Sequence, residues 1–542
     1  MVNTTFHLPA PGNEPVREYR PGTPETQSLQ ACIDSLASEV HEIPCIVGGE
    51  EITTGNIEEV RSPHDHQKVL ARYHAATPEV IARAIENSQD AWREWSETPV
   101  ETRIAIFERA AELLTGKWRD TVNASTMLGQ SKTCFQAEID AACELIDFWR
   151  FNNHFALNQI QVDQPISPRG MWNSVDYRPL EGFVYAVTPF NFTSIAANLP
   201  GAPALMGNVA IWKPSHSAVF SNYYLMKVYE EAGLPPGVIQ FVPGPAREVT
   251  AQLLNDTNFA GLHFTGSTQV FQGLWKEISE RLPSYRSYPR IVGETGGKDF
   301  IFVHPSANPQ AVAVAAVRGA YEYQGQKCSA ASRMYMPRSM WNDVRDRMVA
   351  MIDTIRMGDP RDFSNFMAAV IHEQSFEKIT SYIDRAKNES GAEIVAGGGS
   401  NRETGWFIEP TLIECSDPKF STMEVELFGP VLSTYVYDDA NLEETLELCD
   451  STSPYALTGA VFADDRVAAD HMAKKLRHAA GNFYINDKPT GAVVGQQPFG
   501  GARASGTDDK AGSALNLLRW VAPRTVKENF APPTDYRYPH MG

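Results

Sequence analysis

The stretch GLHFTGSTQVFQGLWKEISERL, residues 261–282, changes from a strand pattern to a helix pattern within a few residues. GLHFT is predicted to be a strand, and Ser267 or Thr268 is predicted to be the N-cap of the helix that follows. The neighbouring segments repeat this order: VIQFV precedes AREVTAQLLND on one side, and PRIVGE follows on the other. Strands and helices that alternate at such short spacing predict βαβ units and a parallel, doubly wound sheet.

The alternation extends in both directions from this stretch. GFVYAVTPF and VAIWKP upstream are predicted strands, and the helix with Leu225, Val228 and Ala232 on one face should end at Gly233. Farther upstream, residues 77–150 have a helical pattern, with Thr77 as the expected N-cap of the first helix.

A second α/β section is predicted between residues 298 and 487. It has helical patterns near residues 311–323 and 373–388, and strand patterns at EIVAG, VLSTYVY and GAVFA. NQIQVDQPISPRGMWNSVDYRPL lacks helical periodicity and is predicted to be a projecting hairpin. LLRWVAPRTVKENF near the end is interpreted as a strand that crosses to another subunit.

The composition limits the classes of function. The 542 residues carry a net charge of −19, which argues against nucleic acid as a partner because an acidic chain repels phosphate backbones. The longest apolar region, residues 195–212, is interrupted by Asn198, Pro200 and Pro203, so no membrane span is expected. The chain is also long enough to favour two or more domains.

Cysteine and histidine usage favours a reducing compartment without a bound metal. The seven cysteines are scattered, odd in number and free of CxxC pairs, so neither a disulfide framework nor a zinc site is predicted. The HDH stretch, residues 64–66, is interpreted as an exposed turn rather than a pair of metal ligands.

The first 25 residues have neither the apolar core of a secretory signal nor an Arg-rich amphipathic helix. We therefore expect a cytoplasmic protein of a bacterium, with the mitochondrial matrix as the alternative if a presequence has been removed. The Pro and Gly content of this segment predicts an extended arm laid over a domain.

Two residues have the chemistry of a catalytic pair. Glu294 in VGETGGKDF ends a predicted apolar strand, where partial burial would raise the pKa of its carboxyl group and suit a base. Cys328 follows 34 residues later among small residues, where a thiolate would be a soft nucleophile. The alternatives are a capping or ion-paired glutamate and a buried, unreactive thiol.

The order of several motifs is more specific than any of them alone. TPFNFTSI, WKPS, FTGS, ETGGK, GQKCSA and ELFGPVLS occur in this order, and residues 40–525 resemble the aldehyde dehydrogenase superfamily. The resemblance implies an α/β, aldehyde dehydrogenase-like fold in which a Rossmann-type domain binds NAD. The implied parts are an NAD-binding domain with an N-terminal helical arm (residues 1–157 and 178–297), an α/β catalytic domain (298–487), a β-hairpin oligomerisation arm with a tail (158–177 and 511–542), and a substrate-anchor loop (488–510).

Further motifs resemble one branch of this superfamily. MLGQSK, ELIDFWRFN and VGQQPFGGARASGTDDKAG are similar to the branch that oxidises glutamate γ-semialdehyde, formed from Δ1-pyrroline-5-carboxylate, to glutamate in proline catabolism. The implied substrate is therefore a small amino-acid aldehyde, and the implied cofactor is NAD.

The resemblance assigns catalytic roles to three residues. Cys328 would attack the aldehyde carbon, and the oxyanion would be held by the side-chain amide of Asn191 and the backbone N–H of Cys328. Hydride would leave for the nicotinamide, and Glu294 would activate the water that hydrolyses the resulting thioester. No metal is implied.

The resemblance also assigns residues to the cofactor. Lys213 would contact the adenosine ribose, and Glu426 the nicotinamide ribose; the full implied set is Lys213, Ser215, Gly266, Ser267, Glu426 and Phe428. One position departs from the pattern: many NAD-preferring relatives have an acidic residue where this chain has His216. A histidine would not repel the 2′-phosphate of NADP, so discrimination against NADP is expected to be weaker.

The resemblance also assigns residues to the substrate. Ser329 and the loop residues Gly491 and Ala492 would hold the substrate carboxylate, while Phe192 and Phe499 would sandwich the methylenes. Some relatives have serine in place of Ala492, so one hydroxyl is missing here. Core packing is the alternative for the two phenylalanines, and Glu144 is a candidate partner for the substrate ammonium.

Three other functions remain as alternatives, and they differ in cofactor, substrate or activity. They are a cysteine hydrolase that needs no nucleotide, a dehydrogenase for another semialdehyde such as succinic semialdehyde, and a relative without catalysis. The predicted protein partners are a second copy of the chain, in a homodimer or larger homo-oligomer, and a proline dehydrogenase as a transient partner.

Overall fold

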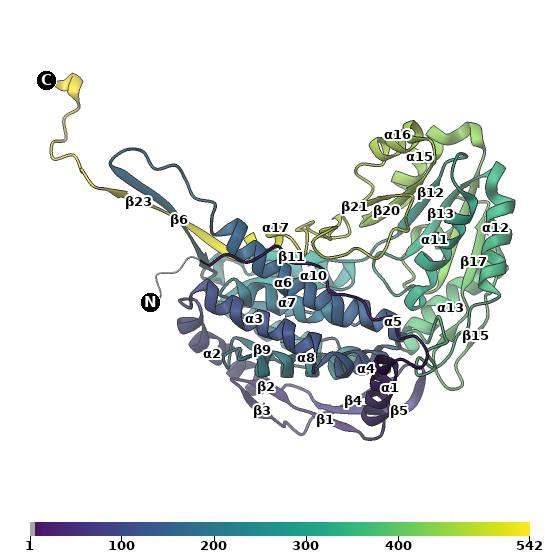
Figure 1. Cartoon of the computed structure of the whole chain (residues 1–542), viewed down its shortest axis with the longest axis horizontal. Coiled ribbons are helices and arrows are strands. Elements are labelled where there is room, and N and C mark those ends of the chain that lie inside the picture. The colour runs from purple at the N-terminus through teal and green to yellow at the C-terminus, as the bar shows by residue number, and fades with distance from the viewer. Residues whose placement is uncertain (1–5) are drawn as a thin grey trace.

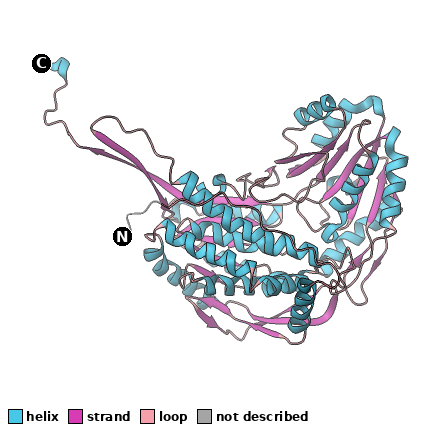
Figure 2. Ribbon diagram, in the orientation of Figure 1, coloured by secondary structure: helices cyan, strands magenta, loops and turns pink. Residues whose placement is uncertain are grey.

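The computed structural model describes residues 6–542 and contains two α/β bodies, each built around a seven-stranded sheet (Figure 1). In both bodies helices pack against the strands of the sheet (Figure 2). The strands of the first sheet, in spatial order, are β11 (Arg290–Glu294), β10 (Phe259–Thr265), β7 (Phe183–Val187), β8 (Val209–Lys213), β9 (Ile239–Phe241), β2 (Cys45–Val47) and β3 (Glu50–Ile52).

The first sheet confirms the predicted parallel core and differs from the prediction at one edge. The strands from β11 to β9 are mutually parallel, whereas β2 runs antiparallel to β9 and β3 runs antiparallel to β2. The sheet is therefore mixed. Short strands near the N-terminus form this edge of the sheet, and they lie outside the predicted βαβ units.

The second sheet is buried on both faces. Its strands, in spatial order, are β14 (Ala392–Ala396), β17 (Thr411–Cys415), β18 (Val431–Tyr437), β13 (Ala331–Pro337), β12 (Asp299–Val303), β20 (Thr458–Phe462) and β21 (Asn482–Ile485). Phe300 and Phe302 of β12 pack into one apolar core, and Ile301 and Val303 pack into another. Alternation across a parallel strand places a hydrophobic core on each side of the sheet.

Local capping chemistry explains where the helices near the first sheet begin and end. Thr77 accepts a hydrogen bond from Val80 N at the start of α2 (Pro78–Trp95), as predicted. Of the two candidates for the next cap, Ser267 is the N-cap of α10 (Thr268–Glu280). α8 (Val219–Ala232) ends at Gly233, whose φ of 94° is readily adopted only by glycine.

The remaining helices cover the two sheets. Around the first sheet they are α3 (Val100–Thr115), α4 (Arg119–Gln130), α5 (Cys134–Ala137), the π-helix η1 (Glu138–Cys143), α6 (Glu144–Phe155), α7 (Thr193–Leu205) and α9 (Ala246–Leu254). Around the second they are α11 (Pro309–Tyr321), α12 (Arg338–Ile352), α13 (Glu373–Asn388), α15 (Leu442–Ser451) and α16 (Arg466–Lys475). Only the π-helical turn departs from the simple helices expected in residues 77–150.

A two-stranded arm projects from the first body (Figure 1). It consists of β6 (Met171–Pro179), paired antiparallel over its whole length with β23 (Val521–Asn529). Residues 158–177 therefore project, but the predicted hairpin is not formed within this segment, because β6 pairs with the C-terminal strand of the same chain. Trp172 and Phe530 make an edge-to-face contact near the end of the arm and are 68% and 55% exposed.

The described part of the N-terminal segment confirms the predicted extended arm. Residues 6–22 form no helix or strand before α1 (Pro24–Ala37), and they run along the helices of the first body (Figure 1). The predicted exposed turn at HDH is wrong in two respects: only His64 lies in a turn, since Asp65 and His66 begin β5 (Asp65–His74), and His64 is buried. Its imidazole contacts the Ser131 hydroxyl at 3.1 Å, and burial lowers its pKa to about 4.

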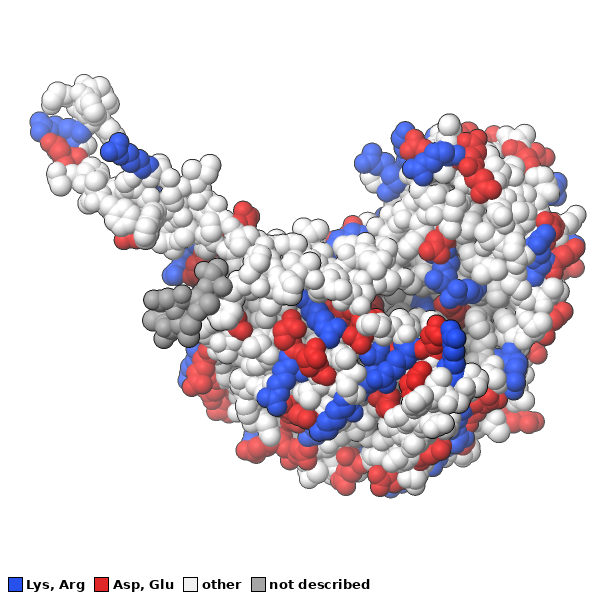
Figure 3. Space-filling view, in the orientation of Figure 1, with Lys and Arg blue, Asp and Glu red and all other residues white. Residues whose placement is uncertain are grey.

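Residues 6–542 contain no helix that is both long and apolar enough to cross a membrane. Acidic and basic side chains are interspersed over the visible face (Figure 3). Within the same residues, no group of three or more His, Cys, Asp or Glu side chains is arranged to hold a metal ion.

Candidate active site

The carboxyl ends of neighbouring parallel strands bring the site residues to one edge of the first sheet. Thr265 at the end of β10 is in register with Glu294 at the end of β11, and Lys213 ends β8 two strands away. Ligands bind at this edge in open α/β sheets, because strand ends and helix N-termini meet there.

Cys328 comes from the second body, in the turn between α11 and β13. Just before it, Tyr323 and Gln324 have φ values of 52° and 54° and so lie in the left-handed region, which costs energy in side chains with a Cβ. The Gln324 amide offsets this cost with two hydrogen bonds, which it donates to Ser131 O at 3.1 Å and to Ala369 O at 2.8 Å. The turn is thereby fixed to both bodies.

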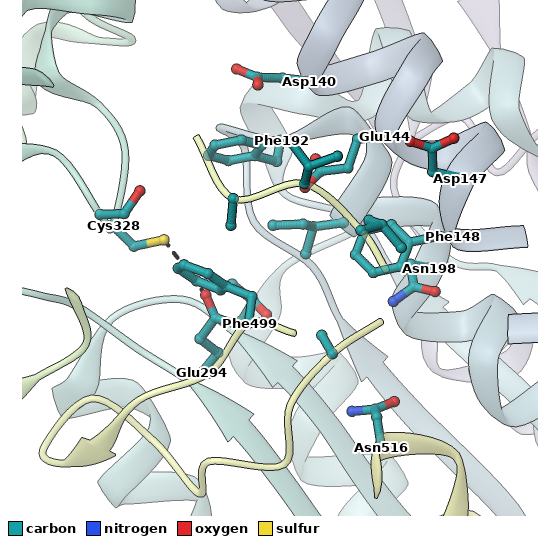
Figure 4. A pocket seen from close by; sticks show the side chains of 18 of the residues that line it. Asp140, Glu144, Asp147, Phe148, Phe192, Asn198, Glu294, Cys328, Phe499 and Asn516 are labelled. Atoms are coloured by element: carbon teal, nitrogen blue, oxygen red, sulfur yellow. Dashed lines mark hydrogen bonds between the residues drawn. The ribbon is translucent and has the colours of Figure 1, made fainter. Parts of the chain in front are cut away.

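Cys328 and Glu294 meet across the gap between the two bodies. The sulfur lies 3.5 Å from Oε1 of Glu294, and the thiol donates to the carboxylate (Figure 4). Burial raises the pKa of Glu294 to about 7. Burial, together with the charge of Glu294, raises the pKa of the Cys328 thiol well above its ordinary value. The resting pair is therefore a neutral thiol beside a carboxyl group that titrates near neutrality.

Asn191 lies beside the turn that carries the cysteine. The side chain is buried, and Nδ2 donates to the carbonyl of Gln326 at 3.1 Å, two residues before Cys328. One N–H of the amide is used in this bond, and an asparagine amide has a second one to offer. Among residues 6–542, the backbone N–H of Cys328 donates to no protein acceptor. These are the two donors expected of an oxyanion site.

Cys328 and Glu294 open into a cavity of about 250 Å³. The rings of Phe192 and Phe499 lie on opposite sides of the space in front of the sulfur (Figure 4). The cavity lining also includes Ser329, Gly491 and Ala492, so all five residues assigned to the substrate from the sequence reach one cavity with the nucleophile. Core packing alone does not account for the two phenylalanines.

Thr490 connects two parts of this cavity and was not identified from the sequence. Its hydroxyl lies 2.7 Å from the hydroxyl of Ser329, so the residue after the cysteine is joined to the loop that begins at Gly491. Gly491 has a φ of 89°, a conformation that favours glycine. No sequence pattern marks a threonine in an irregular, Gly-rich segment as a site residue.

Buried titratable side chains line the cavity on the side of α6 and η1. Glu144 bonds to the Ser194 hydroxyl, and burial raises the pKa of its carboxyl group to about 8. Lys327 lies 3.5 Å from Glu322 and 4.0 Å from Asp140. Lys327 and Asp140 line the cavity but were not singled out, because a charged residue in a helical pattern normally predicts a solvated face.

The residues assigned to the adenosine side lie at the same sheet edge but outside the cavity. The Lys213 ammonium is buried, and that burial lowers its pKa to about 8. Within residues 6–542 it has no ion pair or hydrogen bond. Ser215 follows Lys213 in the loop after β8, while Gly266 and Ser267 form the turn into α10. A buried ammonium and a helix N-terminus fit a ligand with hydroxyl and phosphate groups.

Glu426 and Phe428 come from the second body. Oε1 of Glu426 accepts a hydrogen bond from Gly297 N at 2.9 Å, and a Cβ on Gly296 would meet the same carboxylate at 2.2 Å. The two glycines of ETGGK therefore let Glu426 approach the strand end next to Glu294. Phe428 has a φ of 60°, and its ring packs edge-to-face on that of Phe190.

His216 has a carboxylate beside it, although the sequence lacks one at that position. Oε2 of Glu58, from β4 (Ile57–Ser62), lies 3.7 Å from Nδ1 of His216. The Tyr73 hydroxyl contacts this Nδ1 at 2.9 Å. Burial lowers the pKa of His216, which favours the neutral ring at pH 7. The carboxylate comes from a strand about 160 residues upstream, so the local motif could not reveal it.

The fold and the paired thiol and carboxyl group define an aldehyde dehydrogenase. The chain belongs to the aldehyde dehydrogenase family, whose family model matches residues 52–526.

Within the family, two relatives that match this chain over nearly its whole length have closely similar names. A protein of Dictyostelium discoideum called Delta-1-pyrroline-5-carboxylate dehydrogenase, mitochondrial, is 52% identical over 537 residues, which cover 99% of this chain and 96% of that protein. The crystal structure of the Delta-pyrroline-5-carboxylate dehydrogenase from Mycobacterium tuberculosis bound with NAD is 50% identical, with a TM-score of 0.96 and 100% of both chains covered. Proline utilization A from Bdellovibrio bacteriovorus has a TM-score of 0.91 at 26% identity, and the match covers 97% of this chain and 55% of that one.

Proposed function

We propose that this chain oxidises L-glutamate γ-semialdehyde, formed from Δ1-pyrroline-5-carboxylate, to L-glutamate with NAD, as the second step of proline degradation. The observation that carries the proposal is the 3.5 Å contact of Cys328 with Glu294 inside a cavity that also holds Phe192, Ser329 and Gly491. The Dictyostelium protein and the Mycobacterium structure, at 52% and 50% identity, bear the matching name.

The first chemical step is addition of sulfur to the aldehyde. Because the thiol is neutral at rest, Glu294 takes its proton as the sulfur attacks the carbonyl carbon. The amide of Asn191 and the N–H of Cys328 then hold the oxyanion as its charge develops. NAD, when bound, supplies the oxidation by accepting the hydride from the aldehyde carbon.

The second step is hydrolysis of the thioester on Cys328. Glu294 has by then released the thiol proton to solvent, and its carboxylate takes a proton from water as the water oxygen attacks the acyl carbon. The carbon–sulfur bond breaks, the thiol regains a proton, and the carboxylic acid product leaves. A pKa of about 7 lets Glu294 both accept and release protons near neutral pH.

The substrate roles follow from the lining of the cavity. Ser329 and the backbone of Gly491 and Ala492 hold the α-carboxylate, and Phe192 with Phe499 encloses the methylenes. Glu144 faces the same space and is the partner that we assign to the ammonium. This arrangement favours an amino-acid aldehyde over succinic semialdehyde, which lacks the ammonium.

The first body binds the dinucleotide in this proposal, and the second body carries the nucleophile. Lys213 and Ser215 bind the adenosine ribose, Gly266 and Ser267 the diphosphate, and Glu426 the nicotinamide ribose, with Phe428 beside it. Glu58 supports a preference for NAD over NADP, because its carboxylate lies next to His216 after β8, where an acidic side chain reads the ribose 2′-hydroxyl in dinucleotide-binding folds.

The arm and the cysteines support proposals on partners and compartment. The exposed Trp172 and Phe530 on the β6/β23 arm favour contact with a second copy, in a homodimer or larger homo-oligomer. A transient contact with a proline dehydrogenase would supply the substrate. All seven cysteines are free, which favours a reducing compartment: the bacterial cytoplasm, or alternatively the mitochondrial matrix.

The direct test is NADH formation from pyrroline-5-carboxylate and from a panel of other aldehydes, with NAD and with NADP. The proposal predicts that pyrroline-5-carboxylate has the highest kcat/KM and that NAD is preferred. A higher kcat/KM for succinic semialdehyde would instead favour the same fold acting on another substrate. Turnover of an ester without any nucleotide, with no NAD-dependent oxidation, would favour a cysteine hydrolase.

A further inference from the structure

The N-terminal segment forms part of the cavity wall. Asn13, Glu14 and Val16 line the same cavity as Cys328. These residues belong to residues 13–19, here called the strap, which crosses η1 and α6 in extended form (Figure 1). The strap meets the cavity beside Asp147, on the side away from the sulfur (Figure 4).

The side-chain amide of Asn13 joins the strap to α6 and to the anchor loop through both of its N–H groups and its oxygen. Nδ2 donates to Asp147 Oδ2 at 2.8 Å and to the carbonyl of Val494 at 2.8 Å. Oδ1 accepts from Gln496 Nε2 at 2.9 Å. Val494 and Gln496 follow Gly491 and Ala492 in the same loop, so one side chain fixes this loop to α6.

The strap itself is rigidly held, so Asn13 has a fixed base. The Glu14 carboxylate pairs with Arg119 at 2.5 Å and with Arg150 at 2.8 Å, and Glu14 N donates to Asp147 Oδ1 at 2.7 Å. Farther along, the Tyr19 hydroxyl donates to buried Glu138 at 2.9 Å. Hydrogen-bonded ion pairs away from water hold a segment in one geometry.

We propose that Asn13 is a positioning residue for the substrate carboxylate. By tying the loop that contains Gly491 and Ala492 to the strap, it holds the backbone amides of that loop in their binding geometry before the substrate arrives. Ala492 has no hydroxyl, so this loop can bind the substrate carboxylate only through its backbone amides. The position of those amides therefore matters more in this chain. The inference rests on the proposed function, which assigns the carboxylate to this loop.

The test compares two aldehydes in the full-length protein. Asn13→Ala should raise the KM for pyrroline-5-carboxylate about tenfold, roughly the effect of losing one or two preorganised hydrogen bonds, and leave kcat within about twofold. The KM for propanal, which has no carboxylate, should not change. Gln496→Ala removes one of the two bonds between Asn13 and the loop, from the side of the loop, and leaves the bond to Val494. It should raise the same KM selectively but by less, even if Asn13→Ala proves unstable.

Asn158→Ala is the matched control. Asn158 Nδ2 donates to the carbonyl of Leu8 at 2.7 Å. Asn158 therefore holds the N-terminal segment a few residues before Asn13, but it does not line the cavity. Its KM for both aldehydes should equal that of the unsubstituted protein. The inference is overturned if Asn13→Ala and Gln496→Ala leave the KM for pyrroline-5-carboxylate unchanged or raise both KM values equally. The proposed function is tested separately, by whether the unsubstituted protein prefers pyrroline-5-carboxylate to propanal.

Discussion

Glu294 is the residue on which both proton transfers depend. Its carboxyl group lies 3.5 Å from the sulfur at the end of β11, where burial raises its pKa to about 7. The same burial raises the pKa of the Cys328 thiol, so the sulfur does not carry a standing negative charge. A neutral nucleophile needs a base within reach, and Glu294 is in contact with it.

The pH dependence of turnover should follow the titration of Glu294. A base works in its deprotonated form, so a raised pKa means that activity is lost as the pH falls through about 7. We expect kcat to fall about tenfold per pH unit below that value and to level off above it. Steady-state NADH formation between pH 5.5 and 8.5 measures this, and a profile that stays flat down to pH 5.5 would contradict the role.

Cys328→Ala should abolish NADH formation from pyrroline-5-carboxylate, because the other cysteine of the cavity lining, Cys143, has its sulfur against Glu138 and not against Glu294. NAD binding should remain, since the residues assigned to the dinucleotide lie outside the cavity. NADH formation by absorbance and NAD affinity by calorimetry separate the two effects. Unchanged turnover would refute the assignment of the nucleophile.

Glu58→Gln should shift the preference between the two nucleotides. Removing the charge near the ribose 2′-position should raise kcat/KM with NADP by about fivefold, since an exposed like-charge contact costs up to about 1 kcal/mol. Glu59→Gln is the matched control, because Glu59 is the next residue along β4 but pairs with Arg61 and Arg72 instead. An NADP/NAD ratio that changes equally in both variants would argue against a specific role of Glu58.

At the scale of elements, a buried charge cluster fixes the strap to α4 and η1. Arg119 pairs with Glu14 and Glu138, both at 2.5 Å, and all three side chains are almost fully buried. Burial alone would raise the pKa of Glu138, but its bonds to Arg119 hold it below the ordinary value. The stabilisation from Glu138 is therefore present above the pKa of an ordinary glutamate and is lost as the pH falls through the lowered one.

Arg119→Met should destabilise the protein strongly, because Glu138 would remain buried without its ion-pair partner and Glu14 would keep only the pair with Arg150. Breaking a buried pair in this way costs about 3–5 kcal/mol, so the first unfolding transition should shift down by several degrees. Differential scanning calorimetry at pH 7 measures it. Lys474→Met removes the exposed pair with Asp470 and should leave the transition in place; equal shifts in the two variants would contradict this account.

At the scale of the whole molecule, the β6/β23 arm extends away from both bodies with its aromatic residues exposed (Figure 1). Trp172→Glu should reduce the size of the assembly in solution, since a charge at an apolar contact disfavours association. Sedimentation velocity measures the change, and Lys527→Glu on the facing strand β23 is a polar control on the same arm. Identical sedimentation of Trp172→Glu and the unsubstituted protein would show that the arm is not the interface.

Sequence patterns predicted the parts of the fold that depend on local chemistry. Thr77, Ser267 and Gly233 end or begin helices because capping depends on a few adjacent residues. The partner of β6 was not predicted, because pairing with β23 joins segments about 350 residues apart and both have an irregular pattern. Motifs likewise identified Cys328, but not the strap or Glu58, which reach the site only through tertiary contacts.

The central claim is that the sulfur of Cys328 and the carboxyl group of Glu294 act on one carbonyl, first in addition and then in hydrolysis. Glu294→Gln should lower kcat about 10²- to 10⁴-fold by removing the base, and it should slow hydrolysis of the thioester more than its formation. Mixed with pyrroline-5-carboxylate and NAD and quenched in acid, this variant should show by intact-mass spectrometry the added mass of one glutamyl group, mapped by peptide digestion to Cys328. Unimpaired steady-state turnover without an adduct, or an adduct on a different cysteine, would contradict the account.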